Sequence, residues 1–452
     1  MFRLACLRRT SAAYGLACKS SRYAAASKWQ SPTTPAIGAG SVGAMTRLQY
    51  QSVAGFGSIV TPPVQIQWKM KEKAFHKKYS EVFADRHIGP NADDKEAMLK
   101  SLGYNNITEL LDETIPSTIR LQRELNVEEE CNEKEVLDKL RKIARKNQLW
   151  RSYIGMGYYG SHTPSPIVRS MFENHGWVTA YTPYQPEIAQ GRLECLLNFQ
   201  TMICDLTKMD VANASLLDEG TAAAEAMAMA HRKNRRPKFY IDHKCHPQTI
   251  AVVETRAIAM NIQTYVTDLY RFDFSNAKDV CGILVQYPDT EGTIRTDIEG
   301  LVENAHSSKI VVTMATDLLA MTILKPPGDM DADVVIGTAQ RFGIPVGFGG
   351  PHAAFFAAKN EYVRQIPGRI VGVTKDVNGS KAYRLALQTR EQHIRRDKAT
   401  SNICTSQALL ANMSAMYAIY HGSEGIYNIG KKVHEQTLAL AQGLTSVGHT
   451  IT

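Results

Sequence analysis

The first part of this 452-residue chain lacks acidic residues. No Asp or Glu precedes Glu72, whereas residues 1–71 carry nine Lys and Arg. The remaining residues hold 43 Lys and Arg against 44 Asp and Glu, a net charge of −1, so the overall charge of +8 comes from the N-terminal segment. A nucleic-acid-binding protein needs clustered excess cations on its folded part. The charge balance therefore argues against a nucleic-acid partner.

Long hydrophobic runs and closely paired cysteines are also missing. No stretch of eighteen uninterrupted apolar residues occurs, which argues against a membrane-spanning helix. None of the eight cysteines belongs to a C-x-x-C pair, which argues against a zinc ribbon or a dithiol redox site, and no other metal site is indicated. Scattered cysteines are typical of a reducing compartment, where they act as small buried hydrophobic residues.

Residues 1–65 are rich in Arg, Ser and Ala and contain no acid. This composition is typical of a mitochondrial transit peptide, and a disordered basic tail is the alternative. No long apolar region follows the cations, so a secretory signal is excluded. The segment is therefore predicted to be a targeting sequence outside the fold, and the location to be the mitochondrial matrix.

A helical region is expected at about residues 75–150. Asn91 is placed to cap a first helix that ends at Gly103, and Asn132 with Glu135 forms a capping box for another. These helices are interpreted as packing elements without catalytic residues.

Short apolar runs alternate with helical patterns over residues 151–445. The alternation predicts one large α/β domain with a mostly parallel sheet covered by helices. The expected buried strands are 238–241, 282–285, 310–314 and 334–336, and the expected helices are 222–233, 297–305 and 405–444 with a break around 422–425.

Two segments of this domain suit either a binding site or ordinary structure. Gly220 and Thr221 start an Ala-rich helix whose free N–H groups suit a phosphate, but Asp218 and Glu219 place carboxylates there and are able to satisfy the helix start themselves. The Gly-rich stretch 342–352 suits close approach to a ligand, or a tight loop between strands.

A third segment, residues 155–164, holds Tyr158, Tyr159 and His162 among three glycines. It is either a site on a rigid scaffold or a packed aromatic turn.

Several cationic and imidazole side chains receive the ordinary interpretation. The cluster 231–238 is interpreted as a solvated helix C-terminus. Lys309 and Lys325 flank strands and are expected on the surface rather than as Schiff-base lysines. His243 and His246 are expected to be core or loop histidines.

Five sequence blocks are irregular enough to be specific: 83–90, 153–160, 183–192, 366–373 and 387–405. In these blocks the chain resembles the P-protein family of the glycine cleavage system, the glycine decarboxylases that depend on pyridoxal phosphate. The resemblance covers about residues 80–450.

The resemblance implies a fold-type I transferase-like architecture with a seven-stranded, mostly parallel sheet. Family members consist of two similar halves, and this chain resembles the N-terminal one. Alignment with the catalytic half places Gln340 at the lysine that binds the cofactor, Met314 at the aspartate that pairs with the pyridine nitrogen, and His243 loosely at the ring-stacking histidine. An amide forms no Schiff base, so no cofactor-binding residue is expected in this chain.

The implied activity is that of glycine dehydrogenase (decarboxylating): pyridoxal-phosphate-dependent decarboxylation of glycine and transfer of the aminomethyl group to the lipoyl arm of H-protein. The cofactor is expected in the C-terminal half, and this chain is expected to be inactive without it. Tyr158, Tyr159 and His162 are expected to line a site shared with that half, in an assembly expected to be dimeric.

Two alternatives stay open. One is a non-catalytic scaffold or regulatory subunit that pairs with a catalytic half. The other is an independent pyridoxal enzyme that uses an unrecognised lysine. The family's N-terminal half continues into a small α/β domain that is expected to be missing or truncated here, either because the sequence is a fragment or because it is a truncated product.

Overall fold

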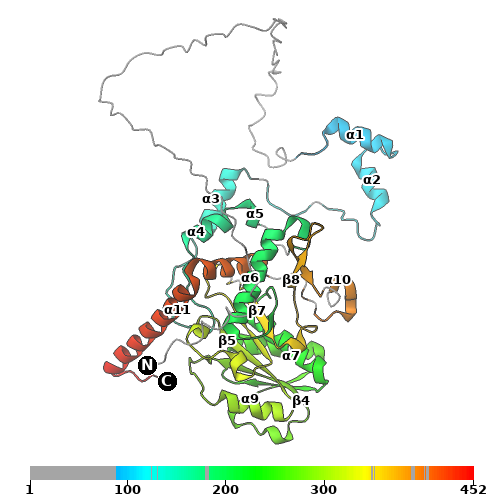
Figure 1. Cartoon of the computed structure of the whole chain (residues 1–452). Coiled ribbons are helices and arrows are strands. Elements are labelled where there is room, and N and C mark those ends of the chain that lie inside the picture. Colours follow the sequence, from blue (N-terminus) through cyan, green and yellow to red (C-terminus); the bar gives the residue numbers. More distant parts are fainter. Residues whose placement is uncertain are drawn as a thin grey trace, which may run out of the picture. The chain divides into compact units, whose positions relative to one another are not determined.

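The computed structural model describes residues 88–451 except 124, 130, 179–182, 348–349, 351, 388–391, 402 and 404–406 (Figure 1). The expected targeting segment, residues 1–65, lies outside the described residues. The chain divides into two units, residues 1–144 and 145–452, and each is described by itself. Within the described residues, no helix combines the length and the apolar character needed to cross a bilayer.

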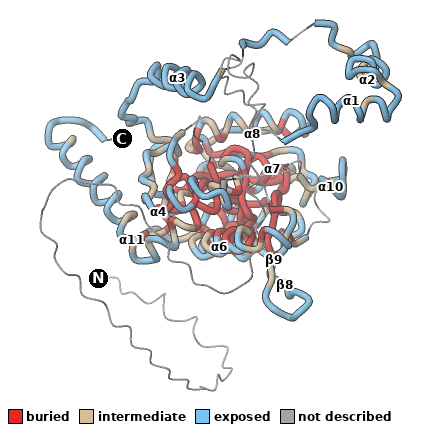
Figure 2. Tube along the Cα trace, turned by 90° about the horizontal axis from the view of Figure 1, so that it is seen from above, coloured by how far each residue is buried: buried red, intermediate tan, exposed pale blue. Residues whose placement is uncertain are grey.

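The described part of the first unit contains three short helices with polar caps at their starts. Asn91 and Asp94 form a reciprocal capping box at α1, and Asn132 and Glu135 exchange the equivalent bonds at 3.0 and 2.9 Å before α3. Both expected caps are confirmed, whereas a helix capped by Asn106 was missed. No described residue between 88 and 144 is buried (Figure 2). The helices are α1 (Ala92–Ser101), α2 (Ile107–Thr114) and α3 (Glu133–Ala144).

A seven-stranded sheet in the order β1-β7-β6-β5-β4-β2-β3 forms the centre of the second unit. Strands β3, β2, β4, β5 and β6 are parallel, and β7 runs antiparallel to β6 and β1. The sheet confirms the expected fold class. Its strands are β1 (Val211–Ala212), β2 (Lys238–Asp242), β3 (Gln263–Thr267), β4 (Val280–Tyr287), β5 (Val311–Asp317), β6 (Val334–Thr338) and β7 (Ala354–Ala358).

Helices cover both faces of this sheet over two buried hydrophobic clusters, which form the interior of the tube in Figure 2. One cluster lies under α7 and α8, and the other lies under α6, α9 and α11. The last helix contains one non-helical residue, Gly422, which confirms the expected break. The helices are α4 (Ser165–Ile167), α5 (His175–Val178), α6 (Gln190–Thr207), α7 (Glu219–Asn234), α8 (Pro247–Met260), α9 (Ile298–Ser307), α10 (Gln392–Arg395) and α11 (Ala408–Ser446).

The Ala-rich sequence of α7 explains its close approach to the sheet. Its residues 219–230 are all buried. A Cβ atom built on Gly282 of β4 would lie 2.8 Å from the Cβ of Ala230, so this contact has no room for a larger residue. Close packing fixes the start of α7 at the carboxyl ends of the strands, where the cavity described below lies.

A two-stranded hairpin follows the sheet and was not predicted. Strands β8 (Ile370–Lys375) and β9 (Lys381–Ala386) pair antiparallel. Asp376 closes their turn, since its Oδ1 accepts hydrogen bonds from the backbone N–H groups of Asn378 and Ser380, each at 2.8 Å. The Asn378-Gly379 pair was the turn signal available in the sequence.

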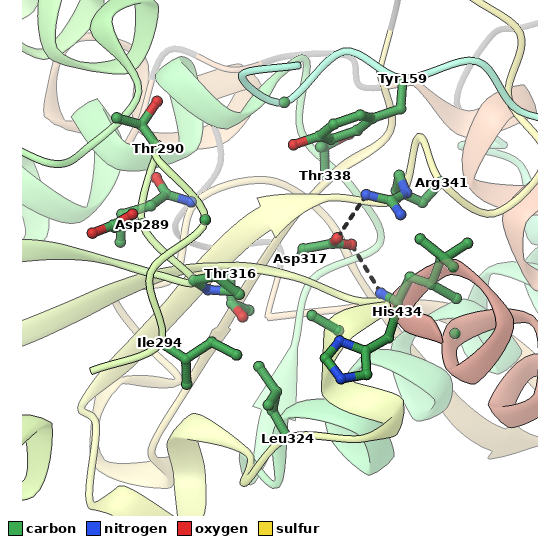
Figure 3. A pocket seen from close by; sticks show the side chains of 18 of the residues that line it. Tyr159, Asp289, Thr290, Ile294, Thr316, Asp317, Leu324, Thr338, Arg341 and His434 are labelled. Atoms are coloured by element: carbon green, nitrogen blue, oxygen red, sulfur yellow. Dashed lines mark hydrogen bonds and ion pairs between the residues drawn. The ribbon is translucent and has the colours of Figure 1, made fainter. Parts of the chain in front are cut away.

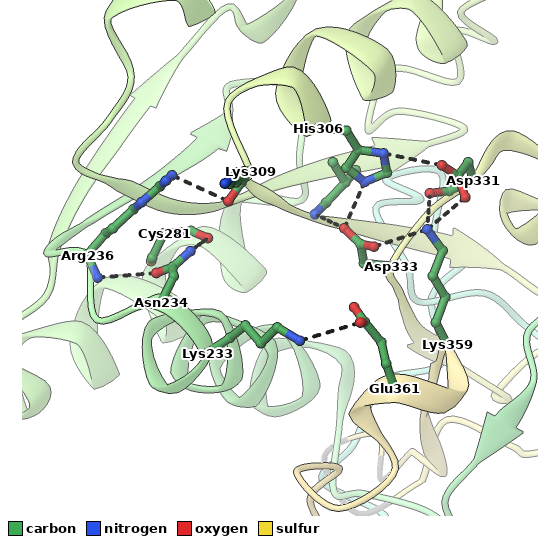
Figure 4. Close-up of polar contacts among 11 residues, drawn as sticks. Lys233, Asn234, Arg236, Cys281, His306, Lys309, Asp331, Asp333, Lys359 and Glu361 are labelled. Carbon is green, nitrogen blue, oxygen red and sulfur yellow. Dashed lines mark hydrogen bonds and ion pairs between the residues drawn. The ribbon is translucent and has the colours of Figure 1, made fainter.

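A buried ion cluster lies where β5 and β6 begin (Figure 4). Asp333, only 6% exposed, accepts from Nε2 of His306 at 2.9 Å, from Nζ of Lys359 at 3.1 Å and from the backbone N–H of Val312 at 2.9 Å. These partners hold the pKa of Asp333 below its usual value, although burial opposes them. The cluster ties the start of β5 to α9 and to the end of β7.

The cation cluster at 231–238 is only partly solvated, which corrects the expectation. Lys233 and Arg235 are exposed, but Nη1 of Arg236 donates to the carbonyls of Val280 at 3.0 Å and Ser308 at 2.8 Å. It also donates to the carbonyl of Lys309 at 3.3 Å (Figure 4). The guanidinium therefore replaces missing backbone donors at the starts of strands, a role that sequence spacing does not show.

Candidate functional site

A cavity of about 490 Å³ lies at the carboxyl ends of β4, β5 and β6 (Figure 3). Register places these ends side by side, because Tyr287 pairs with Thr316 and Asp317 pairs with Thr338. Ligands of parallel α/β sheets bind at this edge. The polar or charged lining residues include Tyr159, Glu219, His246, Gln286, Asp289, Thr290, Thr316, Asp317, Thr338, Arg341 and His434.

Gln340 lies two residues after the end of β6 and is fully enclosed, with 1% of its surface exposed. Its Nε2 donates to the carbonyl of Tyr159 at 2.7 Å and to that of Ile344 at 2.8 Å. Its Oε1 has no partner among the described residues. The side chain thus ties the loop that contains Tyr159 to the loop after β6, while its neighbours Thr338 and Arg341 line the cavity.

Lysine is missing from the described lining of this cavity. Lys325, one of the two considered lysines, has a half-exposed side chain paired with Glu299, and Lys309 is exposed. The surface interpretation of both is confirmed.

Along β5, Asp317 is the side chain that carries a carboxylate into the cavity. Met314 is fully buried in the hydrophobic core and does not line the cavity. Asp317 ends the strand, and its Oδ2 accepts from Nη1 of Arg341 at 2.9 Å (Figure 3). Asp317 was not predicted as a site residue, because the predicted strand stopped at residue 314 whereas β5 continues to Asp317. The assignment of Met314 to the pyridine-nitrogen position stays a prediction.

Two acids occupy the start of α7, as the structural interpretation of that segment expected. Oδ1 of Asp218 accepts from the backbone N–H of Thr221 at 2.7 Å and caps the helix. Glu219 is buried and accepts from the hydroxyl of Thr249 at 3.0 Å. Burial, assisted by the charges of Asp317 and Asp218, raises the pKa of Glu219 to about 7. A phosphate at this helix start would meet these two carboxyl groups.

The aromatic segment divides between two cavities. Tyr159 lines the large one, with its ring centroid 4.3 Å from the guanidinium carbon of Arg341 (Figure 3). Tyr158 lines a smaller cavity of about 90 Å³ with Asp218, and its ring centroid lies 4.6 Å from that of His352. His162 is exposed and lines neither. The structure thus brings Tyr158 and Tyr159 to the edge of the sheet without His162.

His246, rather than His243, is the histidine of its segment that reaches the cavity. Its Nδ1 lies 2.9 Å from the hydroxyl of Thr290, and burial lowers its pKa, which favours the neutral imidazole. His243 does not line the cavity and has a side chain that is 45% exposed. Pro247 begins α8 directly after His246, so the turn before a helix N-terminus is the signal that could have separated the two.

Comparisons with known proteins agree with this architecture. The family model "Glycine cleavage system P-protein" matches residues 85–452. The chain is 58% identical over 369 residues to mitochondrial glycine dehydrogenase (decarboxylating) of Mus musculus, and the match covers 82% of this chain and 36% of that protein. The corresponding protein of Gallus gallus is 59% identical over 372 residues, with the same coverage of each chain.

A solved structure extends the similarity to three dimensions. A glycine decarboxylase (P-protein) of the glycine cleavage system in inhibitor-bound form superposes with a TM-score of 0.72 at 34% identity, over 80% of this chain and 82% of that one. The chain spans a little over a third of the length of the mouse and chicken relatives. The match of family model, sequence and fold shows that the chain belongs to the glycine cleavage system P-protein family.

Proposed function

We propose that this chain is the N-terminal, non-cofactor-binding half of a glycine decarboxylase, and that it acts by pairing with a catalytic half. The single observation that carries the proposal is Gln340. An amide that already donates to two carbonyls stands where the family resemblance places the reactive amine. The cavity beside it has no lysine in its described lining that would take over.

The cavity also fits pyridoxal phosphate poorly. Asp218 and Glu219 stand at the helix start where a phosphate would bind, and Asp317 at the end of β5 is already paired with Arg341. Three carboxyl groups near the cavity would repel a phosphate group. The residues do not fit the cofactor, so in the proposed enzyme the catalytic half holds it and performs the decarboxylation of glycine.

The role left to this half is structural and positional. Gln340 fixes the loop of Tyr158 and Tyr159, and Tyr158 remains 40% exposed at the surface. None of the described residues of the helical region 88–144 is buried, and large apolar side chains such as Leu140 and Ile143 are more than half exposed. Apolar helix faces of this kind are typical of segments that pack against another polypeptide. In the proposal this polypeptide is the catalytic half, the pair forms a dimeric assembly, and lipoylated H-protein docks on it.

Reconstitution tests the proposal directly. The chain is co-expressed with the C-terminal part of the chicken relative, and glycine–bicarbonate exchange is measured with H-protein. We expect exchange from the pair and none from either part alone. Borohydride treatment in the presence of pyridoxal phosphate is expected to label only the C-terminal part. A labelled lysine in this chain would contradict the proposal and favour an independent pyridoxal enzyme, and a stable pair without any gain in exchange would favour a scaffold.

We also propose import into the mitochondrial matrix. The mouse and chicken relatives are named mitochondrial, and residues 1–71 carry nine cations without an acid. The segment fused to a fluorescent reporter is expected to direct it to mitochondria. A variant with Arg3, Arg8 and Arg9 changed to Gln is the control that should remain outside.

A further inference from the structure

Three consecutive residues before the two tyrosines have left-handed backbone conformations. The φ angles of Gly155, Met156 and Gly157 are +71°, +58° and +88°. Glycine adopts such angles readily, but Met156 carries a Cβ atom, so its backbone is strained there. Strained backbone persists only where the surrounding structure holds it, and it is concentrated at functional sites. The contacts that hold this left-handed turn, residues 155–157, therefore bear on its role.

The start of α8 supplies these contacts. Nε2 of Gln248, in the first turn of the helix, donates to the carbonyl of Met156 at 2.5 Å. A Cβ atom built on Gly157 would lie 3.3 Å from Cδ2 of His246, so a side chain there would have to displace the imidazole or the loop. The imidazole is itself held, since its Nδ1 lies 2.9 Å from the hydroxyl of Thr290. One amide and one imidazole at the start of α8 thus define the conformation of the turn.

Tyr158 follows this turn directly and is held by close neighbours. Its ring centroid lies 4.6 Å from that of His352, and a Cβ atom built on Gly350 would lie 3.0 Å from its Cε1. The residue is nevertheless 40% exposed. An aromatic ring with a hydroxyl group that is fixed and still exposed is typical of a group that contacts another molecule. The left-handed turn therefore determines where such a group points.

We propose that Gln248 is a positioning residue, whose hydrogen bond to Met156 maintains the left-handed turn and so directs Tyr158 toward the site shared with the catalytic half. The inference rests on the proposed function, in which that half performs the chemistry. Without this bond the strained Met156 is free to relax to an ordinary backbone conformation. A change of φ at this residue rotates the chain that follows it, so Tyr158 would change direction.

Gln248 and Gln340 act on opposite sides of Tyr158 along the chain. Gln248 holds the carbonyl of Met156, two residues before it, and Gln340 holds the carbonyl of Tyr159, the residue after it. The two amides come from different elements, the start of α8 and the loop after β6. Loss of either bond would leave the tyrosine loop held at one end only, while the sheet and its helices keep their own contacts.

The test uses the 452-residue chain paired with the C-terminal part of the chicken relative, with H-protein present and glycine–bicarbonate exchange as the readout. The C-terminal part is titrated, so that kcat at saturation and the half-saturating concentration are obtained separately. We expect Gln248→Ala to lower kcat about tenfold or more, because small displacements of reacting or positioning groups cost up to about a hundredfold in rate. The half-saturating concentration should stay the same, since Gln248 is part-buried and acts through the loop.

Matched variants identify the hydrogen bond as the cause. Gln248→Glu keeps the shape of the side chain but has no donor when ionised, so it should lower kcat as Gln248→Ala does. Gln442→Ala, an exposed change of the same type on α11, is the control and should exchange as the parent does. If Gln248→Ala fails to fold by circular dichroism, Gly157→Ala decides, because it disturbs the same turn from the side of the loop.

A double variant separates positioning from a general structural role. Tyr158→Ala removes the directed side chain, so Gln248→Ala added to it should lower kcat little further, whereas independent structural effects would multiply.

Three results would overturn the inference: parent-like kcat in Gln248→Ala, recovery of the full rate at a higher concentration of the C-terminal part, or multiplied losses in the double variant. Failure of the proposed function has a different signature, because the parent pair itself then shows no exchange, and the inference falls with it.

Discussion

The ion cluster around Asp333 and the cavity around Asp317 lie in the same sheet, but their polar groups are in opposite states. In the cluster, Asp333 has three partners and His306 has two carboxylates beside it. In and around the cavity, Oε1 of Gln286, Oε1 of Gln340 and both ring nitrogens of His352 are enclosed without partners among the described residues.

The polar groups of the cluster are hydrogen-bonded and stabilise the fold, whereas those named around the cavity lack hydrogen-bond partners among the described residues. A satisfied buried charge is costly to disrupt, since removal of one partner leaves the other uncompensated. An unsatisfied polar group already destabilises the protein, so its removal costs little or even stabilises. Substitutions in the two regions should therefore differ in size and even in sign.

The largest effect is expected from Asp333→Ala. Loss of this carboxylate leaves the N–H of Val312 without its acceptor and leaves His306 and Lys359 with only the exposed Asp331 as a carboxylate partner. It should lower the free energy of unfolding by about 3–5 kcal/mol. Urea unfolding followed by circular dichroism measures it. Asp331→Ala is the control, because that side chain is 70% exposed and should cost about 1 kcal/mol or less. If Asp333→Ala and Asp331→Ala lowered the free energy of unfolding equally, the buried carboxylate would not be the stabilising member of the cluster.

Glu219→Gln should act in the opposite direction above neutral pH. The folded-state pKa is raised from 4.5 to about 7, so the parent loses stability as pH rises through this window. The amide does not ionise, and the variant should be more stable than the parent at pH 8 by up to about 3 kcal/mol, with the advantage absent near pH 4.5. Unfolding at a series of pH values checks this. A difference independent of pH would show that the carboxyl group is not buried as described.

Gln340→Leu tests the tie between the two loops. It removes the donors to the carbonyls of Tyr159 and Ile344, at about 1 kcal/mol each, but also an unpaired oxygen, so a loss of about 1–2 kcal/mol is expected. Increased hydrogen exchange should be confined to residues around 158–161 and 344–347. Gln340→Glu is the comparison, because it keeps an acceptor and loses the donors. If hydrogen exchange in these two loops did not change, the hydrogen bonds of Gln340 would not be what holds the loops in place.

The smallest effect concerns the protonation of His306. Its bond to Asp333 raises its pKa, so the stabilisation is full below pH 6.5 and is lost as pH rises through the folded-state pKa. His306→Gln should therefore cost about 1 kcal/mol more at pH 6 than at pH 9. His434→Gln on α11 is the control, because this histidine lines the cavity and is not paired with Asp333. If His306→Gln lowered the free energy of unfolding equally at pH 6 and pH 9, the proposed stabilisation by the protonated His306 beside Asp333 would be wrong.

Local sequence signals predicted much of this fold. The Asn caps of α1 and α3, the apolar runs of β2, β4, β5 and β6, and the break at Gly422 depend on neighbouring residues. Edge strand β3 and the antiparallel β7 were missed. The mostly exposed sequence of β3 has no apolar run, and β7 lies between β6 and the sequence-distant β1, a pairing that no local signal shows.

The site was less accessible to sequence reasoning. Tyr159 was singled out in its Gly-rich aromatic segment and Gln340 through the family resemblance, whereas Gln286 and Asp317 were not predicted. Strand β5 is buried from Val311 to Thr316, so Met314 lies in the core, whereas Asp317 reaches the cavity because it ends the strand. Its place depends on where the strand ends rather than on residue type. The unpaired state of Gln286 depends on atoms from several distant segments, so no sequence pattern reveals it.

The hydrogen bonds by which Gln340 joins two loops have a consequence for protein engineering. A lysine introduced at this position would bury an ammonium group. To react as a free amine it would have to give up hydrogen bonds to the two carbonyls, and this would release the loop of Tyr158 and Tyr159. The amide joins two loops through its hydrogen bonds, so a reactive amine at this position is incompatible with the present loop arrangement. A design that places a nucleophile here must change the loop together with the residue.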